Sequence, residues 1–75
     1  MSTVKVQYME GDSVIDYQRS SKFYTPPVPR KGEGMVLEGV EYVVYDVVHS
    51  PNNLEKIMGQ ICELYIIIVK IQRIG

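Results

Sequence analysis

Two side chains of this 75-residue chain have the chemistry of a nucleophile and its base, Cys62 and His49. A cysteine thiol becomes an active nucleophile when a neighbouring histidine takes its proton and a third group orients that histidine. Cys62 follows Ile61 on an apolar stripe, where a cysteine more often serves as a small core residue. A single cysteine and a single histidine also fall short of a zinc site. We therefore expect no catalytic residues, no metal and no cofactor, and we do not expect an enzyme.

The nine carboxylates are scattered along the chain, mostly on expected turns and solvent-facing strand positions. Asp46 is the exception, because it stands where the alternation of a strand breaks. A bulge explains that position more simply than acid–base catalysis does. Gly32 and Gly34 lack the strand-to-helix context of a phosphate-binding loop.

Segment 19–31 combines basic and aromatic side chains and contains no acid. These residues are Arg19, Lys22, Phe23, Tyr24, Arg30 and Lys31. Arginine and aromatic residues dominate the hot spots of protein interfaces, although cations and rings together also hold single-stranded nucleic acid. The net charge of −1 lacks the basic excess usual in nucleic-acid binders, so we favour a protein partner. A solvated loop whose aromatics cover a small core explains the same residues without any partner.

Period-two alternation of apolar residues predicts a mainly β chain. The expected strands are 4–8, 14–18, 35–39, 40–50 and 63–74. Gly11-Asp12 and Glu38-Gly39 supply turns between neighbouring strands. Three prolines in the connection 18–34 exclude a central strand or a helix there, so we expect a long basic, proline-rich loop.

Strand 40–50 carries an irregularity in its pattern. Tyr42 and Val44 share one face, whereas Val47 falls on the opposite parity. A bulge near Tyr45 and Asp46 would restore the register and bend the strand. Small barrels need such bends in order to close.

Residues 51–62 have the spacing of a short amphipathic helix. Ser50 and Pro51 match an N-cap followed by proline at the first helical position. The apolar residues recur at i, i+3, i+4 and i+7, and they are Leu54, Ile57, Met58 and Ile61. We expect a helix before the last strand, with an irregular loop as the alternative.

The last strand is apolar on both faces. One face carries Leu64, Ile66 and Ile68, and the other carries Tyr65, Ile67, Val69 and Ile71. A domain of this size has one small core and marginal stability, and oligomerisation is a common support. The second face must therefore meet the helix, the proline loop or another subunit. We assign the face of Tyr65, Ile67, Val69 and Ile71 to a homo-oligomer contact.

The run PRKGEGMVLEGVEYVVYDVVH, about a third of the chain, resembles the core of many small uncharacterised bacterial and bacteriophage proteins. It also resembles the second and third strands of SH3-like barrels. The matching positions are Pro29, Gly32, Glu33, Met35, Leu37, Gly39, Tyr42, Val44, Val47 and His49. The run departs from the common pattern at Glu33-Gly34 and is followed by a longer insertion at 51–62. The resemblance implies one SH3-like domain over 1–75, either a partly open five-stranded β-barrel or a curled antiparallel sheet with one short helix.

The function expected from these features is a non-catalytic interaction protein that occupies the surface of a partner protein. The bacteriophage resemblance implies an inhibitor of a host protein, such as a defence protein. Nucleic-acid binding through loop 19–31 is the alternative, and a structural homo-oligomeric subunit is a further one. We expect a cytoplasmic chain with no membrane partner, because the start lacks a signal-peptide pattern and the longest apolar run is too short to span a bilayer.

Overall fold

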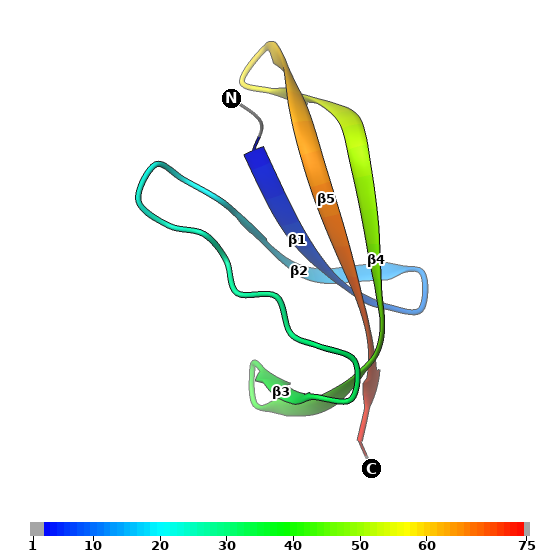
Figure 1. Cartoon of the computed structure of the whole chain (residues 1–75). Helices are drawn as coiled ribbons and strands as arrows, with labels where there is room; N and C mark the ends of the chain where they lie inside the picture. The colour runs from blue at the N-terminus through cyan, green and yellow to red at the C-terminus, as the bar shows by residue number, and fades with distance from the viewer. Residues whose placement is uncertain (1–2, 75) are drawn as a thin grey trace.

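The computed structural model describes residues 3–74, which form one mixed β-sheet and contain no helix within that range. The strands are β1 (Thr3–Glu10), β2 (Ser13–Arg19), β3 (Gly34–Leu37), β4 (Val40–Ile57) and β5 (Gln60–Arg73). Their order across the sheet is β2-β1-β5-β4-β3, so β2 and β3 are the two edges (Figure 1). The prediction of a mainly β chain with five strands is confirmed, and the sheet is not closed.

The central pair of the sheet is parallel. β1 pairs with β5 in one direction, from Thr3↔Leu64 to Met9↔Lys70, whereas the other three pairings are antiparallel. Parallel neighbours need a long connection between them, and the chain from β2 through β4 supplies it. The alternative of a purely antiparallel curled sheet is therefore wrong in this pairing.

Two-residue turns join β1 to β2, β3 to β4 and β4 to β5. Glu38 and Gly39 both have positive φ angles, 50° and 79°, as a type I′ hairpin turn requires. In the first hairpin Gly11 alone has a positive φ, of 60°, which matches the first central position of a type II′ turn. The two turns predicted from the sequence are confirmed.

The third turn replaces the predicted helix over 51–62. β4 continues to Ile57, and Ile57 pairs with Gln60 across Met58 and Gly59. Those two residues have φ angles of 52° and 82°, so they form a second type I′ turn. The helix prediction is wrong because the i, i+3, i+4 spacing arises here from two strands and the turn between them.

Bulges bend the sheet at the points where the register shifts. The predicted bulge is confirmed, because the partner of β4 changes by one residue between Val44 and Asp46. A second shift lies between Ser50 and Asn53, and Asn52 there has a φ of 63°. A third interrupts the pairing of β1 with β2.

The hydrophobic core lies on one face of the sheet, called here the core face. Its buried residues come from β1, β4 and β5, and they are Val6, Tyr8, Tyr42, Val44, Ile67, Val69 and Ile71. Partly buried side chains of β3, Met35 and Leu37, pack against them. The core is therefore formed by strands that lie side by side rather than by two stacked sheets.

The proline-rich connection, residues 20–33, runs beside the core face (Figure 1). It is fixed at both ends by backbone hydrogen bonds. Ser20 N donates to Val4 O at 2.8 Å, and Gly32 N donates to Val44 O at 2.8 Å. Pro26 is buried between these ends. The prediction of a long loop is confirmed, and it is an anchored one.

The two faces of β5 differ from the predicted assignment. Ile67, Val69 and Ile71 are buried in the core of the single chain, so this face is not available as an oligomer contact. On the opposite face Ile66 and Ile68 are only half-buried. The strand is two-faced as predicted, but the choice of face was wrong because period-two alternation does not say which side meets the core.

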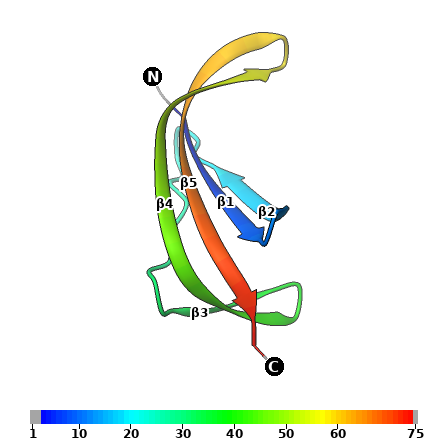
Figure 2. The same ribbon diagram turned by 90° about the vertical axis from the view of Figure 1, so that its right-hand side faces the viewer.

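The β4–β5 hairpin extends beyond the rest of the sheet. The described pairing of β1 with β5 starts at Leu64, and Leu64 pairs with Asn53, so residues 54–63 form a two-stranded extension, called here the arm. The arm bends over at the top of the molecule (Figure 2). The radius of gyration is 13.1 Å, above the ~11 Å of a compact chain of this length. The arm and the β3 end give the molecule an extent of 41 Å along its longest axis.

Candidate functional site

The first part of the predicted contact loop is an exposed aromatic turn. Ser21 and Tyr24 form an isolated bridge, with Ser21 N donating to Tyr24 O at 2.8 Å. The bridge presents Phe23, which is 91% exposed. The Lys22 ammonium lies 5.6 Å from the centre of the Phe23 ring. Tyr24 is half-exposed and its hydroxyl donates to Gln18 Oε1 at 3.3 Å. We call residues 21–24 the aromatic turn.

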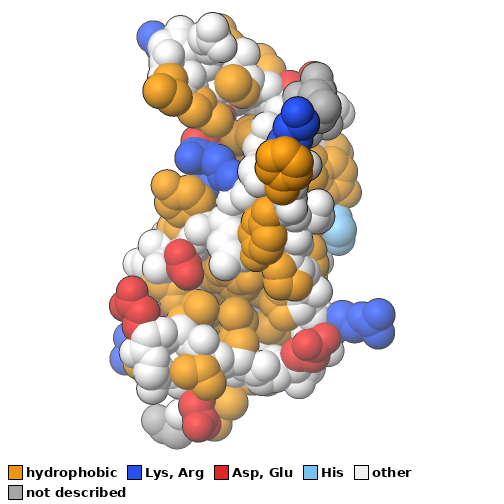
Figure 3. Space-filling view, turned by 90° about the vertical axis from the view of Figure 1, so that its left-hand side faces the viewer, with side chains coloured by type: hydrophobic (Ala, Val, Ile, Leu, Met, Phe, Trp, Pro, Cys, Tyr) orange, Lys and Arg blue, Asp and Glu red, His pale blue; other side chains and the backbone are white. Residues whose placement is uncertain are grey.

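The second part of the loop is a cationic turn at its other end. Arg30 and Lys31 are exposed. Glu33 holds the turn, because its Oε1 accepts from Arg30 N at 3.1 Å and its own N–H donates to Arg30 O at 3.1 Å. The extended proline segment separates this turn from the aromatic turn (Figure 1). Basic side chains in the space-filling view accordingly lie apart rather than in one patch (Figure 3).

Arg19, the remaining predicted contact residue, belongs to a different cluster. Its guanidinium donates to Glu55 Oε1 at 2.7 Å, and it also stacks on the Tyr17 ring at 5.0 Å. Lys5 binds the other oxygen of Glu55 at 3.4 Å and lies 4.8 Å from the same ring. The structure therefore places the six predicted residues in three separate parts of the surface and does not bring them together in one site.

This cluster was not predicted, since Lys5 and Glu55 lie fifty positions apart in the sequence. It ties the arm to the first hairpin, because Glu55 belongs to the arm and its two cations belong to β1 and β2. Burial opposes the charge of Glu55, but the hydrogen bonds from Arg19 and the positive charge of Lys5 outweigh it and lower the pKa of the Glu55 carboxyl. Glu55 is therefore held as a carboxylate between two cations.

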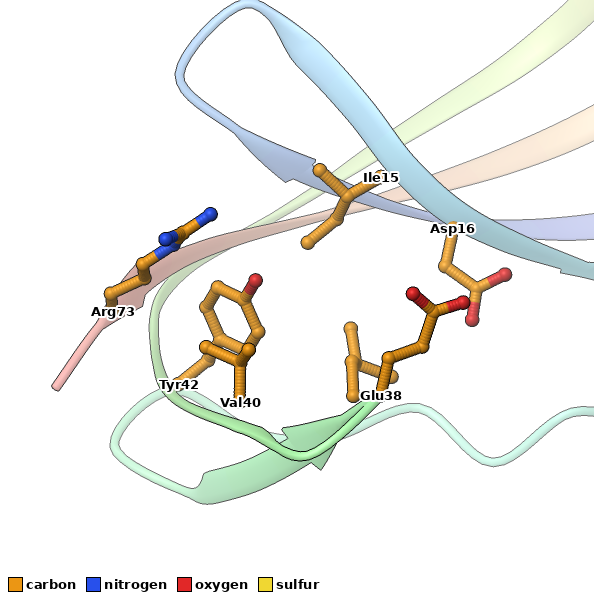
Figure 4. Close-up of a pocket in the computed structure, with 7 residues that line it drawn as sticks. Ile15, Asp16, Glu38, Val40, Tyr42 and Arg73 are labelled. Atoms are coloured by element: carbon orange, nitrogen blue, oxygen red, sulfur yellow. The ribbon is translucent and has the colours of Figure 1, made fainter.

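A pocket of about 250 Å³ lies where the two edge strands approach each other (Figure 4). Ile15 and Asp16 of β2 line one side, and the β3–β4 hairpin and Arg73 line the other. The carboxylate of Glu10, 2.9 Å from Arg73 Nε, raises the pKa of Arg73. The lining combines the apolar side chains of Ile15, Leu37 and Val40 with the carboxylates of Asp16 and Glu38.

A second pocket of about 260 Å³ lies between the proline segment and the sheet. Pro27, Val28 and Pro29 line it on one side, and Tyr8 and Met35 line it on the other. Burial, together with the nearby negative charge of Asp16, raises the pKa of the Tyr8 hydroxyl. The wall of this pocket is largely apolar.

His49 and Cys62 do not form a nucleophile pair. In the ladder His49 lies opposite Ile67, whereas Cys62 lies opposite Glu55. On β5 the positions of Ile67 and Cys62 differ by five, an odd number, so the side chains of His49 and Cys62 point to opposite faces. His49 Nδ1 instead lies 2.9 Å from the Tyr65 hydroxyl, and the two rings are edge to face.

Within residues 3–74 no group of three His, Cys, Asp or Glu side chains is placed to hold a metal ion. The same range contains no helix long and apolar enough to span a bilayer. Comparison with family models, curated proteins and solved structures finds no match to this chain.

Proposed function

We propose that this chain is a small non-catalytic binding module that holds a partner protein, built on a partly open sheet of the SH3-like kind to which its sequence bears a resemblance. Exposure of Phe23 is the observation that supports the proposal. The ring is 91% exposed on a turn closed by the Ser21–Tyr24 bridge. A large aromatic side chain presented on an ordered turn has little conformational entropy to lose on binding, and such residues are frequent hot spots.

The neighbours of Phe23 favour a protein surface over nucleic acid. Lys22 is the cation beside the ring, and Arg19 is engaged with Glu55 away from it. Arg30 and Lys31 lie beyond the proline segment, so the loop does not line one positive groove that could follow a phosphate backbone. An aromatic residue with a single flanking cation suits a protein pocket with an acidic rim.

The bacteriophage resemblance supports inhibition of a host protein as the way in which such binding acts. An inhibitor that occupies a host protein would need the aromatic turn and no chemistry of its own. The cationic turn, Arg30 and Lys31, then contributes a secondary contact, and Phe23 of the aromatic turn is the anchor.

Site-specific photocrosslinking tests the proposal directly. Phe23 is replaced by photoreactive benzoylphenylalanine, and Asp12, an exposed residue of the β1–β2 turn, is replaced in a matched control. After irradiation in an extract of the cells that contain the protein, we expect a defined protein adduct from position 23 and none from position 12. An excess of unmodified chain should suppress the adduct, whereas the Phe23→Ala chain should not.

Two outcomes would contradict the proposal. Equal adducts from both positions would mean that the aromatic turn is not a specific site. An adduct that disappears on nuclease treatment would assign the turn to nucleic acid instead.

A further inference from the structure

The arm exposes apolar side chains on the face that points away from the first hairpin. Leu54 and Ile61 are each 74% exposed, and Met58 at the turn is 98% exposed. Hydrophobic side chains also reach the surface over the upper lobe of the molecule (Figure 3). Lys56 and Glu63 are exposed beside them. We call Leu54, Lys56, Ile61 and Glu63 the outer face of the arm.

Strand register places these four residues on one face. Leu54 lies opposite Glu63, and Lys56 lies opposite Ile61. Residues opposite each other in an antiparallel pair share a face, as do residues two apart along one strand. The four side chains therefore form a square, with the two apolar residues on one diagonal and the two charges on the other.

The other face of the arm is held in place. Glu55, between Leu54 and Lys56, points the opposite way and binds both Arg19 and Lys5. At the base of the arm Asn53 Nδ2 donates to Ser50 Oγ at 3.0 Å across the bulge. The outer face is consequently presented by an arm that is fastened at its base and along its inner side.

We propose that the outer face of the arm is a self-association surface and that its occupant is the same face of a second copy of this chain. Consider a two-fold axis that runs along the Leu54–Ile61 diagonal, parallel to the face. It places Leu54 against Leu54 of the second copy and Ile61 against Ile61 of the second copy. The same rotation exchanges the ends of the other diagonal, so Lys56 of each chain meets the partner's Glu63. The square is therefore self-complementary in both hydrophobicity and charge, as a two-fold interface requires.

The charges select a second copy over other partners. A face built for an acidic partner would carry cations alone, and one built for a membrane would not place a carboxylate beside its apolar residues. Here one cation and one anion flank an apolar diagonal on opposite sides. Neither takes part in a salt bridge among residues 3–74, so both are free to pair across the axis.

The interface is small, because only about five side chains of each chain take part. Standard protein interfaces bury about 1,600 Å² in total, and weaker ones bury less than about 1,200 Å². We therefore expect a reversible dimer with a dissociation constant between about 10 μM and 1 mM.

Sedimentation equilibrium of the full chain over that concentration range tests the proposal through a charge swap. Lys56→Glu places two like-charge pairs across the axis, and Glu63→Lys does the same with the opposite sign. Each single reversal should weaken the dimer by at least about tenfold. The double variant, Lys56→Glu with Glu63→Lys, restores both pairs and should return the dissociation constant to within about threefold of the original. Lys31→Glu, on the cationic turn, is the matched control and should leave it unchanged.

A sedimentation profile that stays monomeric up to about 1 mM would overturn the proposal. So would a double variant as weak as the single ones, because reciprocal pairing is what the swap measures. All three substituted positions are exposed, and thermal unfolding of each of the four variants checks that it folds. The result is independent of the crosslinking at position 23, which needs neither the arm nor a dimer.

Discussion

The two halves of the β4–β5 hairpin form one continuous ladder but differ in what surrounds them. In the half beside β1, Ile71 is 1% exposed, and in the arm Ile61 is 74% exposed. The two residues are ten positions apart on the same strand and point to the same face. Their burial differs because β1, β3 and the proline-rich loop cover the first half, whereas the arm has two strands only.

A strand of apolar residues therefore does not determine its own burial. Alternation specifies which side chains share a face, and the neighbouring strands decide whether that face becomes core. In this chain the covering is complete around Val44 and Val69 and absent over Leu54. The same chemistry gives a core in one half of the hairpin and an exposed surface in the other.

Replacing one isoleucine in each half should give the largest contrast. Ile71→Ala removes core contacts and leaves a cavity, so we expect a loss of about 3 kcal/mol in the free energy of unfolding. Ile61→Ala should cost less than about 0.5 kcal/mol, because its side chain is already solvated in the single chain. Urea denaturation at low micromolar concentration, where the chain is monomeric, measures both. Similar losses at the two positions would mean that the arm packs as tightly as the core.

Alanine substitutions at the turn glycines of the two regions should change the free energy of unfolding by an intermediate amount. Gly39 and Gly59 have φ angles of 79° and 82°, and a Cβ at either would meet no atom within 4 Å. An alanine at Gly39 should cost about 1–2 kcal/mol through backbone strain alone. Gly59→Ala should cost less in global unfolding, because its effect is limited by the free energy of opening the arm locally.

Gly34→Ala is the matched control for this pair. Gly34 does not have a positive φ, and a Cβ there would lie at ordinary contact distance, 3.7 Å, from Tyr42 O. Urea denaturation of the three variants compares them on one scale. Equal losses for Gly39→Ala and Gly59→Ala would show that the arm opens only when the whole sheet unfolds.

Local chemistry in the sequence was sufficient for the features that depend on neighbouring residues. Glycine at Gly39 identified a two-residue turn because a positive φ there favours glycine. The parity change between Val44 and Val47 identified the bulge, because alternation in a strand has a fixed period. These features need no information from the rest of the chain.

Features that depend on the partner strand were not accessible in the same way. Leu54, Met58 and Ile61 fit a helical stripe, but in the structure they belong to two strands and a turn. Arg19 lies apart from the loop cations because it pairs with Glu55, and Glu55 reaches Arg19 only because the arm bends back. The parallel pairing of β1 with β5 likewise joins the two ends of the chain.

The smallest expected effect concerns the ion pairs of Glu55 with Arg19 and Lys5, which are present on the inner face of the arm and not on its outer face. The pKa of Glu55 is lowered by Arg19 and Lys5 against the effect of burial. A lowered pKa means that the contact stabilises the folded arm above the ordinary pKa of glutamate, about 4.3, and that this stabilisation is lost as the pH falls through the folded value. We expect amide protection factors in the arm to decrease by about two- to fivefold on acidification, while those around Val69 stay unchanged.

Glu55→Gln should reproduce this loss at neutral pH and remove most of the pH dependence, because the amide cannot change its charge. Glu63→Gln is the matched control, since it alters a carboxylate of the same arm on the outer face, where no ion pair among residues 3–74 holds it. Hydrogen exchange followed by NMR, at low micromolar concentration and with each variant compared with the original chain at the same pH, measures the protection factors. If Glu55→Gln left the arm amides as protected as before, the arm would be held by its strand pairing and bulge alone. The rigidity of the outer face would then depend on Asn53 and Ser50 rather than on the ion pairs.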